Sequence, residues 1–194
     1  MKRVSVIILA VITMVSCGGG GTSASKISGS IDAKYQQICV GFFIIPEGGS
    51  YFPVTNGKFN FNLPEAVDEK FFGDLKEFMG DFDKDKVTVS DKDAMFARAY
   101  FYAIDENYQG RTLNGKFRPM RLQYDEKDSG IIVEYAYFDR DVTITGTDHY
   151  RRDYTYNLEL KKGWNVVVTQ GDFKKVSIST SSISKGVKWE VKEI

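Results

Sequence analysis

The stretch that decides the fold is YTYNLEL at residues 154–160, in which large apolar side chains alternate with polar ones. Successive side chains of a strand point to opposite faces of a sheet, so this period of two predicts a strand with one buried and one wet face. The same alternation recurs in KFNFNL at 58–63 and in VKWEVK at 187–192. The three segments predict a protein built from half-buried strands.

Turn sequences separate such segments at short intervals, and Asn56-Gly57 is the clearest of them, because both residues tolerate the positive φ of a tight hairpin. The others are Asn114-Gly115, Asp128-Ser129-Gly130, Lys162-Gly163 and Lys185-Gly186. The predicted strands lie near 26–32, 37–45, 58–63, 86–90, 94–104, 116–124, 131–138, 141–146, 154–160, 164–169, 173–180 and 186–193. Many short strands between close turns indicate an all-β, mostly antiparallel β-sandwich, with a β-barrel as the alternative.

One segment has a different period. Between Pro64 and Met79 the apolar residues fall at helical spacing, acidic residues occupy the first turn, and Gly80 follows as a cap. We expect one short helix here, after the third predicted strand, lying across a sheet edge or a barrel mouth.

The amino terminus carries a targeting signal. Lys2 and Arg3 precede an apolar run at 4–15, which is too short to span a bilayer and is typical of a secretory signal peptide. Met14-Val15-Ser16-Cys17 resembles the lipobox of bacterial lipoproteins, with Met14 in place of the usual leucine. The resemblance implies cleavage before Cys17, attachment of diacylglycerol to its thiol, and acylation of the new amino terminus by a fatty acid such as palmitate. An ordinary signal peptide is the alternative.

Four glycines follow Cys17, and then Thr22-Ser23-Ala24-Ser25. This composition buries little apolar surface and behaves as a flexible linker. The chain is thus predicted to comprise a signal peptide at 1–16, a lipid tether at 17–25 and a single β-rich domain at 26–194. We expect it in the bacterial cell envelope, anchored in the outer membrane, and facing either the periplasm or the cell surface.

Two further resemblances concern the body of the protein. The opening at 26–64, ending in GKFNFNLP, resembles transthyretin-like and carboxypeptidase-regulatory-like β-sandwich modules. DRDVTITGT at 139–147, YNLELKKGWN at 156–165 and GVKW at 186–189 are similar to an uncharacterised group of β-rich lipoproteins of Bacteroidota-type bacteria. That resemblance implies an envelope location and supplies no catalytic residue.

The charge balance argues against nucleic acid as a partner. The chain has 26 basic and 26 acidic residues, and removing residues 1–16 takes Lys2 and Arg3 with it, so that the mature net charge is about −2. A protein that neutralises phosphates needs a basic surplus.

Cys39, in the apolar run at 38–43, is predicted to be a small buried hydrophobe rather than a reactive thiol.

No catalytic, cofactor-binding or metal-binding residue is predicted. His149, the only histidine, lies among charged residues in the sequence. It is predicted to be part of an exposed hairpin loop rather than a catalytic base. Asp81, Asp83 and Asp85 alternate as in a calcium loop, but Lys86 and Lys92 occupy the positions where an EF-hand needs glycine and glutamate. A carboxylate pair for sugar hydrolysis stays open, since the chain has many acids.

The aromatic residues, 14% of the chain, are the remaining indication of function. Three pairs sit two residues apart and are predicted to share a strand face: Tyr100 and Tyr102, Tyr135 and Tyr137, Tyr154 and Tyr156. Such tyrosines either pack a core or stack on a partner. The leading interpretation is a non-catalytic binding or accessory module for a glycan or protein partner, attached to membrane lipid through Cys17. An envelope hydrolase with a carboxylate pair and a lipocalin-like carrier of a small apolar ligand are the alternatives.

Overall fold

The computed structural model describes residues 25–42, 49–80, 86–105, 117–124, 131–149, 153–172, 175–180 and 187–191. The predicted signal peptide at 1–16, residues 17–24 of the predicted tether, which include Cys17, and the aspartates at 81–85 lie outside these ranges, as do the turn sequences at 114–115, 128–130 and 185–186. Interpretations of those residues stay predictions. No helix in the described ranges has the length and apolarity that crossing a membrane requires.

Within these ranges most residues belong to strands, with one short α-helix and one short 3-10 helix. In chain order the elements are β1 (Lys26–Ser30), β2 (Gln37–Gly41), β3 (Ser50–Pro53), β4 (Lys58–Asn62), η1 (Glu69–Phe71), β5 (Gly73–Asp74), α1 (Leu75–Met79), β6 (Val87–Val89), β7 (Met95–Ile104), β8 (Phe117–Tyr124), β9 (Ile131–Phe138), β10 (Val142–Asp148), β11 (Asp153–Leu160), β12 (Gly163–Gly171), β13 (Lys175–Thr180) and β14 (Val187–Val191). Each predicted strand segment overlaps one of these strands, although β10, β11 and β12 extend beyond their predicted bounds, and the all-β prediction is confirmed.

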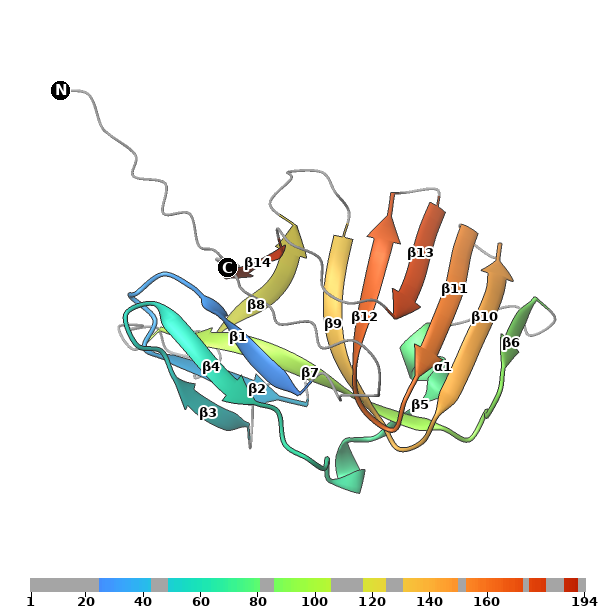
Figure 1. Ribbon diagram of the computed structural model, residues 1–194, viewed down its shortest axis with the longest axis horizontal. Coiled ribbons are helices and arrows are strands. Elements are labelled where there is room, and N and C mark those ends of the chain that lie inside the picture. Colours follow the sequence, from blue (N-terminus) through green and yellow to red (C-terminus); the bar gives the residue numbers. More distant parts are fainter. Residues whose placement is uncertain are drawn as a thin grey trace.

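The strands form two sheets (Figure 1). β1 and β4 pair as a small sheet, and a large sheet runs β3-β2-β7-β8-β9-β12-β13-β11-β10-β6, with β14 on β8 and β5 on β7. Every described pairing is antiparallel except that of β11 with β13. The large sheet runs from β3 to β6 and the described strands do not close into a barrel, so the sandwich is the correct alternative.

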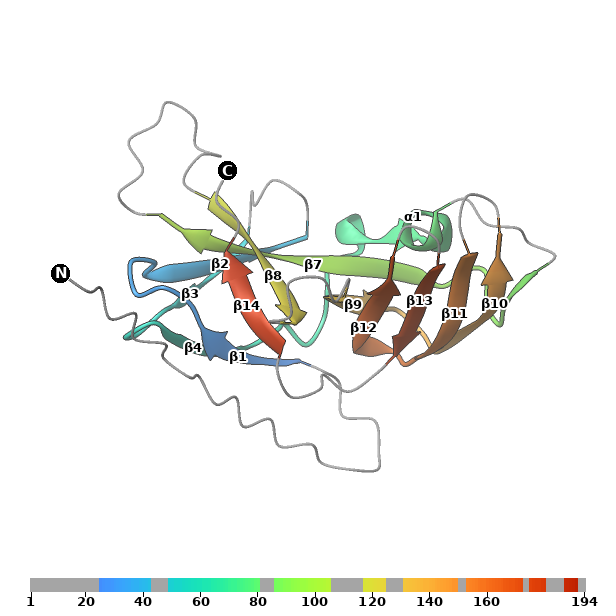
Figure 2. The same ribbon diagram turned by 90° about the horizontal axis from the view of Figure 1, so that it is seen from above.

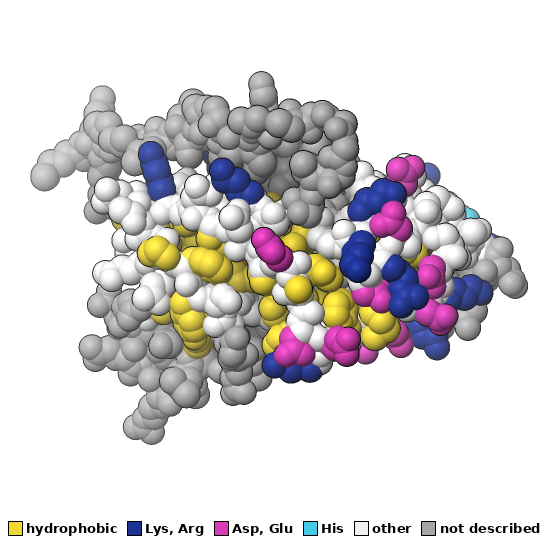
Figure 3. All heavy atoms as spheres, turned by 60° about the horizontal axis from the view of Figure 1, so that its bottom comes forward, with side chains coloured by type: hydrophobic (Ala, Val, Ile, Leu, Met, Phe, Trp, Pro, Cys, Tyr) yellow, Lys and Arg dark blue, Asp and Glu magenta, His cyan; other side chains and the backbone are white. Residues whose placement is uncertain are grey.

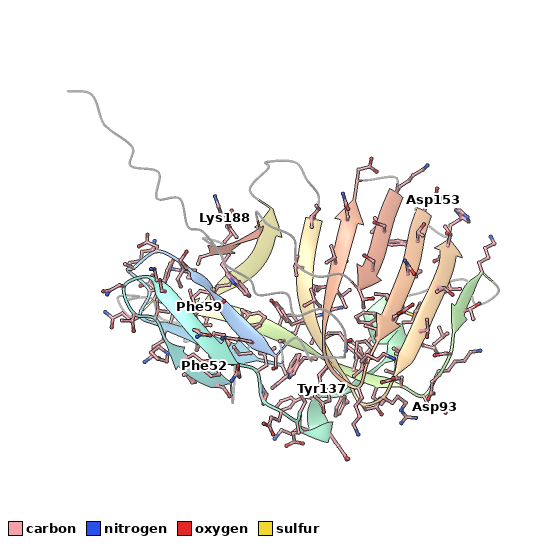
Figure 4. All side chains as sticks on the ribbon, viewed as in Figure 1. Phe52, Phe59, Asp93, Tyr137, Asp153 and Lys188 are labelled. Atoms are coloured by element: carbon pink, nitrogen blue, oxygen red, sulfur yellow. The ribbon has the colours of Figure 1, made fainter. Side chains whose placement is uncertain are left out.

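The long strand β7 lies between two layers, with β1 and β4 on one side of it and α1 on the other (Figure 2). The large sheet thus has a core on each of its two faces, and successive side chains of β9 pack alternately in one core and in the other. Tyr135 and Tyr137 join the first core, which also contains Phe59 and Phe61 of the small sheet. Ala136 and Phe138 join the second core, which lies under α1 and is continued by β10 and β11. Figure 4 shows Phe52 and Phe59 in the small-sheet half of the molecule, apart from Tyr137.

The predicted alternation and turns agree with the structure. The side chains of β4 alternate between exposed and buried, and those of β11 do so from Thr155 onward. Asn56 and Gly57 have φ of 51° and 72°, as a tight hairpin requires, and Thr55 and Lys58 exchange two main-chain hydrogen bonds across them. The hairpin nevertheless joins two sheets, because β3 pairs with β2 and β4 pairs with β1.

The expected helix is present but much shorter than its apolar spacing indicates. Val67 and Phe71 pack in the first core, whereas Leu75 and Phe78 pack in the second, on the opposite face of the large sheet. The segment must pass from one face to the other, so it divides into η1, the short strand β5 and the five-residue α1. Gly80, with φ of 73°, ends α1 as predicted.

The position of α1 also differs from the expectation. Phe78 packs edge-on against Phe96 and Phe138, so the helix covers a sheet face instead of an edge. Asp74 caps its amino end through a 3.0 Å hydrogen bond from the N–H of Glu77. The alternation pattern also missed β3, a short edge strand of exposed and half-buried residues, and the two-residue β5.

Candidate functional site

Three neighbouring strands diverge near the middle of the large sheet. β7 pairs with β9 from Phe96 to Ala99 and then with β8 from Phe101 to Ile104. Among the described residues, β8 and β9 pair with each other at Leu122 with Val133 and at Gln123 with Ile132. Tyr100, between the two pairings of β7, has a ladder partner on its β2 side, Gly41, and none in β8 or β9. The sheet is therefore open at this point.

A pocket of about 420 Å³ occupies this opening, which we call the junction pocket. Its volume lies within the range of small-ligand sites, about 300–1,000 Å³. Its described lining is mostly apolar and comes from β7, β8, β9 and β14: Arg98, Ala99, Tyr100, Phe101, Tyr102, Pro119, Met120, Ile132, Val133, Glu134 and Trp189. Ile132 is 40% exposed, the most exposed large aliphatic side chain among the described residues, and so belongs to the pocket's surface rim.

The pocket has one charged corner. Arg98 of β7 and Glu134 of β9 form an ion pair, with Nε and Oε1 3.4 Å apart, and both side chains are about two-thirds buried. Arg98 Nε is buried and has no hydrogen-bond partner in the part of the chain that the structure describes. An unpaired buried donor costs about 1–3 kcal/mol, so this corner is incompletely satisfied.

Aromatic rings of α1 and β7 hold the arginine in place. The guanidinium carbon of Arg98 lies 5.9 Å from the ring centre of Phe78 and 5.8 Å from that of Phe96. A cation over an aromatic face is attracted by the ring's quadrupole. Arg98 therefore bridges the second core and the junction pocket, and α1 helps to fix the orientation of the charged corner.

Trp189 of β14 forms part of the apolar wall. Its ring lies 4.9 Å from that of Phe101, centre to centre, and its Nε1 donates a 3.3 Å hydrogen bond to the main-chain oxygen of Ser28. Gly29 of β1 permits this approach, because a Cβ there would overlap the indole ring. A contact between the first and last described strands thus builds the wall.

Two of the predicted tyrosines line the junction pocket. Tyr100 is half-buried and Tyr102 is buried, and both belong to the same face of β7. Burial, together with Tyr100 and Cys39 nearby, raises the pKa of Tyr102 to about 12. The phenol of Tyr102 is therefore neutral at physiological pH.

The other two pairs share a strand face as predicted but pack mainly in the cores. Tyr135 and Tyr137 are both buried in the first core, and burial raises the pKa of Tyr135. The rings of Tyr154 and Tyr156 stack with centres 6.4 Å apart, and the Tyr156 hydroxyl donates to the carbonyl of Met79 in α1. Burial, and then the nearby carboxylate of Asp148, raises the pKa of Tyr156 to about 12. These residues stabilise the fold.

The remaining predicted residues lie away from the pocket. His149 is exposed and pairs with Asp153 across 2.5 Å, at the rim of the sheet where Figure 4 labels Asp153. Cys39 is fully buried, as expected. The described residues contain no group of three or more His, Cys, Asp or Glu side chains that could hold a metal ion.

Sequence reasoning did not identify Arg98 and Glu134. One signal was available, because Arg98 is the only charged residue in the run AMFARAYFYAI at 94–104, and Glu134 is the only one in IIVEYAYF at 131–138. A charge inside an apolar strand needs a partner. That the two strands lie side by side could not be read from either run alone.

Comparisons of the chain with protein-family models, with curated proteins and with solved structures find no match.

Proposed function

We propose that the protein is a lipid-anchored, non-catalytic binding protein of the bacterial cell envelope, which holds a protein or glycan partner at the junction pocket. The observation that carries this proposal is the pocket itself, an apolar opening in the sheet that has a single charged corner. Pockets that bind ligands combine mostly apolar walls with a few polar groups that orient the ligand.

The lipobox-like sequence ending in Cys17 supports the proposed envelope location. Two or three acyl chains hold a protein on a membrane stably, whereas one gives marginal binding. The glycine-rich segment after Cys17 would then separate the folded body from an outer-membrane surface. Charge supports a partner other than nucleic acid: on the face in Figure 3, basic side chains are interspersed with acidic ones at the end formed by β6, β10 and β11.

The pocket favours binding over the two alternatives. Hydrolysis of a glycosidic bond by the usual mechanism needs two carboxyl groups facing across the substrate. Among the described lining residues Glu134 is the one carboxylate, and it is paired with Arg98. A lipocalin-like carrier encloses its ligand within a closed barrel, whereas this pocket lies between strands of an open sheet.

The test is site-specific photo-crosslinking in the bacterium that makes the protein. A photoreactive amino acid replaces Ile132 on the pocket rim, and the matched control places it at Tyr51, which is 52% exposed and is not among the pocket's lining residues. We expect a discrete protein or glycan adduct from position 132 that position 51 does not give. Identical adducts from both positions, or none from position 132, would refute binding at the junction pocket.

A further inference from the structure

We infer that the junction pocket recognises a phenol, the side chain of a tyrosine presented by a protein partner. This inference rests on the proposed function and specifies the partner's chemistry. Its basis is the juxtaposition of an apolar pocket of limited volume with the Arg98–Glu134 pair in one corner.

The lining selects an apolar ring. Nine of the eleven described lining residues are aliphatic or aromatic, so a group that enters the pocket loses contact with water on most of its surface. A sugar ring carries hydroxyls around its edge, and most of them would be left without partners against such walls. An aromatic ring gains from the same burial and can pack on the faces or edges of Tyr100, Phe101 and Trp189.

The charged corner selects the polar end of that ring. Arg98 and Glu134 neutralise each other, so a ligand with a net charge would leave one charge uncompensated. A phenol hydroxyl is neutral, and it can accept from the guanidinium while it donates to the carboxylate. Phenylalanine offers neither function and the indole of tryptophan only donates, so tyrosine is the side chain that satisfies both members of the pair.

The location of the pocket indicates insertion of a side chain rather than addition of a strand. The opening lies between β7, β8 and β9, inside the large sheet, and each of these strands already has a neighbour on its other side. A partner backbone therefore has no free sheet edge to pair with at this point. A single aromatic anchor in a central pocket is a common source of binding energy between proteins.

The experiment uses the full-length protein and three small probes that carry the competing chemistries. These are p-cresol for the tyrosine side chain, toluene for phenylalanine and methyl glucoside for a sugar. Binding is measured by saturation-transfer NMR titration. We expect p-cresol to bind about two- to tenfold more tightly than toluene, the ratio that one net hydrogen bond supplies, and methyl glucoside not to bind.

Three variants locate the site and assign the preference. Ile132→Glu places a charge on the rim of the pocket and should abolish p-cresol binding. Tyr51→Ser, at the other strongly exposed large hydrophobic residue among those that the structure describes, should leave it unchanged. The double variant Arg98→Met/Glu134→Leu removes both charges together and should bind p-cresol and toluene equally. Circular dichroism confirms that each variant is folded. The Ile132→Glu variant keeps Arg98 and Glu134, so it tests the location of the binding site even if the double variant fails to fold.

Three results would overturn the inference: toluene binding as tightly as p-cresol to the unaltered protein, methyl glucoside binding in place of p-cresol, or equal p-cresol binding by the Ile132→Glu variant. Its failure is distinguishable from failure of the proposed function. Crosslinking at position 132 without p-cresol binding refutes only the phenol, whereas p-cresol binding without any partner adduct refutes the envelope-partner function.

Discussion

The indole of Trp164 in β12 donates a 2.8 Å hydrogen bond to the main-chain carbonyl of Pro64, 100 residues earlier in the chain. The same ring packs edge-on against Tyr137 and lies near Phe42, so it ties the segment between β4 and η1 to the large sheet. Trp164 therefore fixes the point where this segment begins its passage between the two cores.

Replacement of Trp164 by phenylalanine should lower the free energy of unfolding by about 2 kcal/mol, because the substitution removes a buried hydrogen bond and part of a packed ring. Urea denaturation measures the change. Trp189→Phe is the matched comparison and should cost less, since its hydrogen bond to Ser28 is longer, at 3.3 Å. Equal losses in the two variants would contradict this role for the Pro64 contact.

Gly146→Ala should destabilise the protein by about 3 kcal/mol. Gly146 has φ of 130°, and an added Cβ would overlap the main-chain oxygen of Lys86 where β10 pairs with β6. Gly80→Ala is the control, since Gly80 also has a positive φ but has open space around its Cβ position, and it should cost only about 1 kcal/mol. Thermal denaturation distinguishes the two, and a smaller loss at Gly146 than at Gly80 would refute the close approach of β6.

The pH dependence of stability should respond to Asp139→Asn. Burial alone would raise the pKa of Asp139, but hydrogen bonds from the Arg140 side chain and from the N–H of Met95 outweigh it and lower the pKa below its ordinary value of 3.8. The folded state therefore favours the carboxylate, and this stabilisation is complete above the unfolded pKa and is lost as the pH falls through the folded one.

For that variant we expect a loss of about 1 kcal/mol at pH 7 that shrinks toward zero as the solution is acidified well below the ordinary pKa. Urea denaturation at a series of pH values measures it, with exposed Glu65→Gln as the control. Parallel stability curves for Asp139→Asn and the unaltered protein would show that the carboxylate charge has no role.

His149→Ala should change the free energy of unfolding by less than about 0.5 kcal/mol, because the His149–Asp153 pair lies at the solvent-exposed rim of the sheet. Partner crosslinking from position 132 should likewise persist in this variant. A large loss of stability or of crosslinking would give His149 a role beyond the hairpin.

Cys17→Ala should release the protein from the membrane fraction and abolish its labelling by radioactive palmitate, because the thiol and the cleavage site would no longer support acylation. Cys39→Ala is the control and should keep both the label and the membrane association, since Cys39 is fully buried in the fold. Persistent labelling of the Cys17→Ala protein would refute the lipoprotein assignment.

Local sequence features predicted most of the strands, but they did not predict which strands pair with one another. The alternation around Phe59 and Phe61 correctly gave the buried face of β4, and Asn56-Gly57 gave its hairpin. Helical spacing between Pro64 and Met79 gave the wrong extent for the helix, because Phe71 and Phe78 pack on opposite faces of the sheet. The periodicity of apolar residues indicates that a side chain is buried, but it does not indicate in which of the two cores the side chain packs.

The candidate site shows the same division. The sequence by itself determined that Tyr100 and Tyr102 share a face of one strand, because the alternation of side chains in a strand is a local property of the backbone. Only the tertiary structure placed Arg98 beside Glu134 and opened the sheet next to this pair, at Tyr100, because the order and register of β7, β8 and β9 depend on long-range pairing that no single segment encodes.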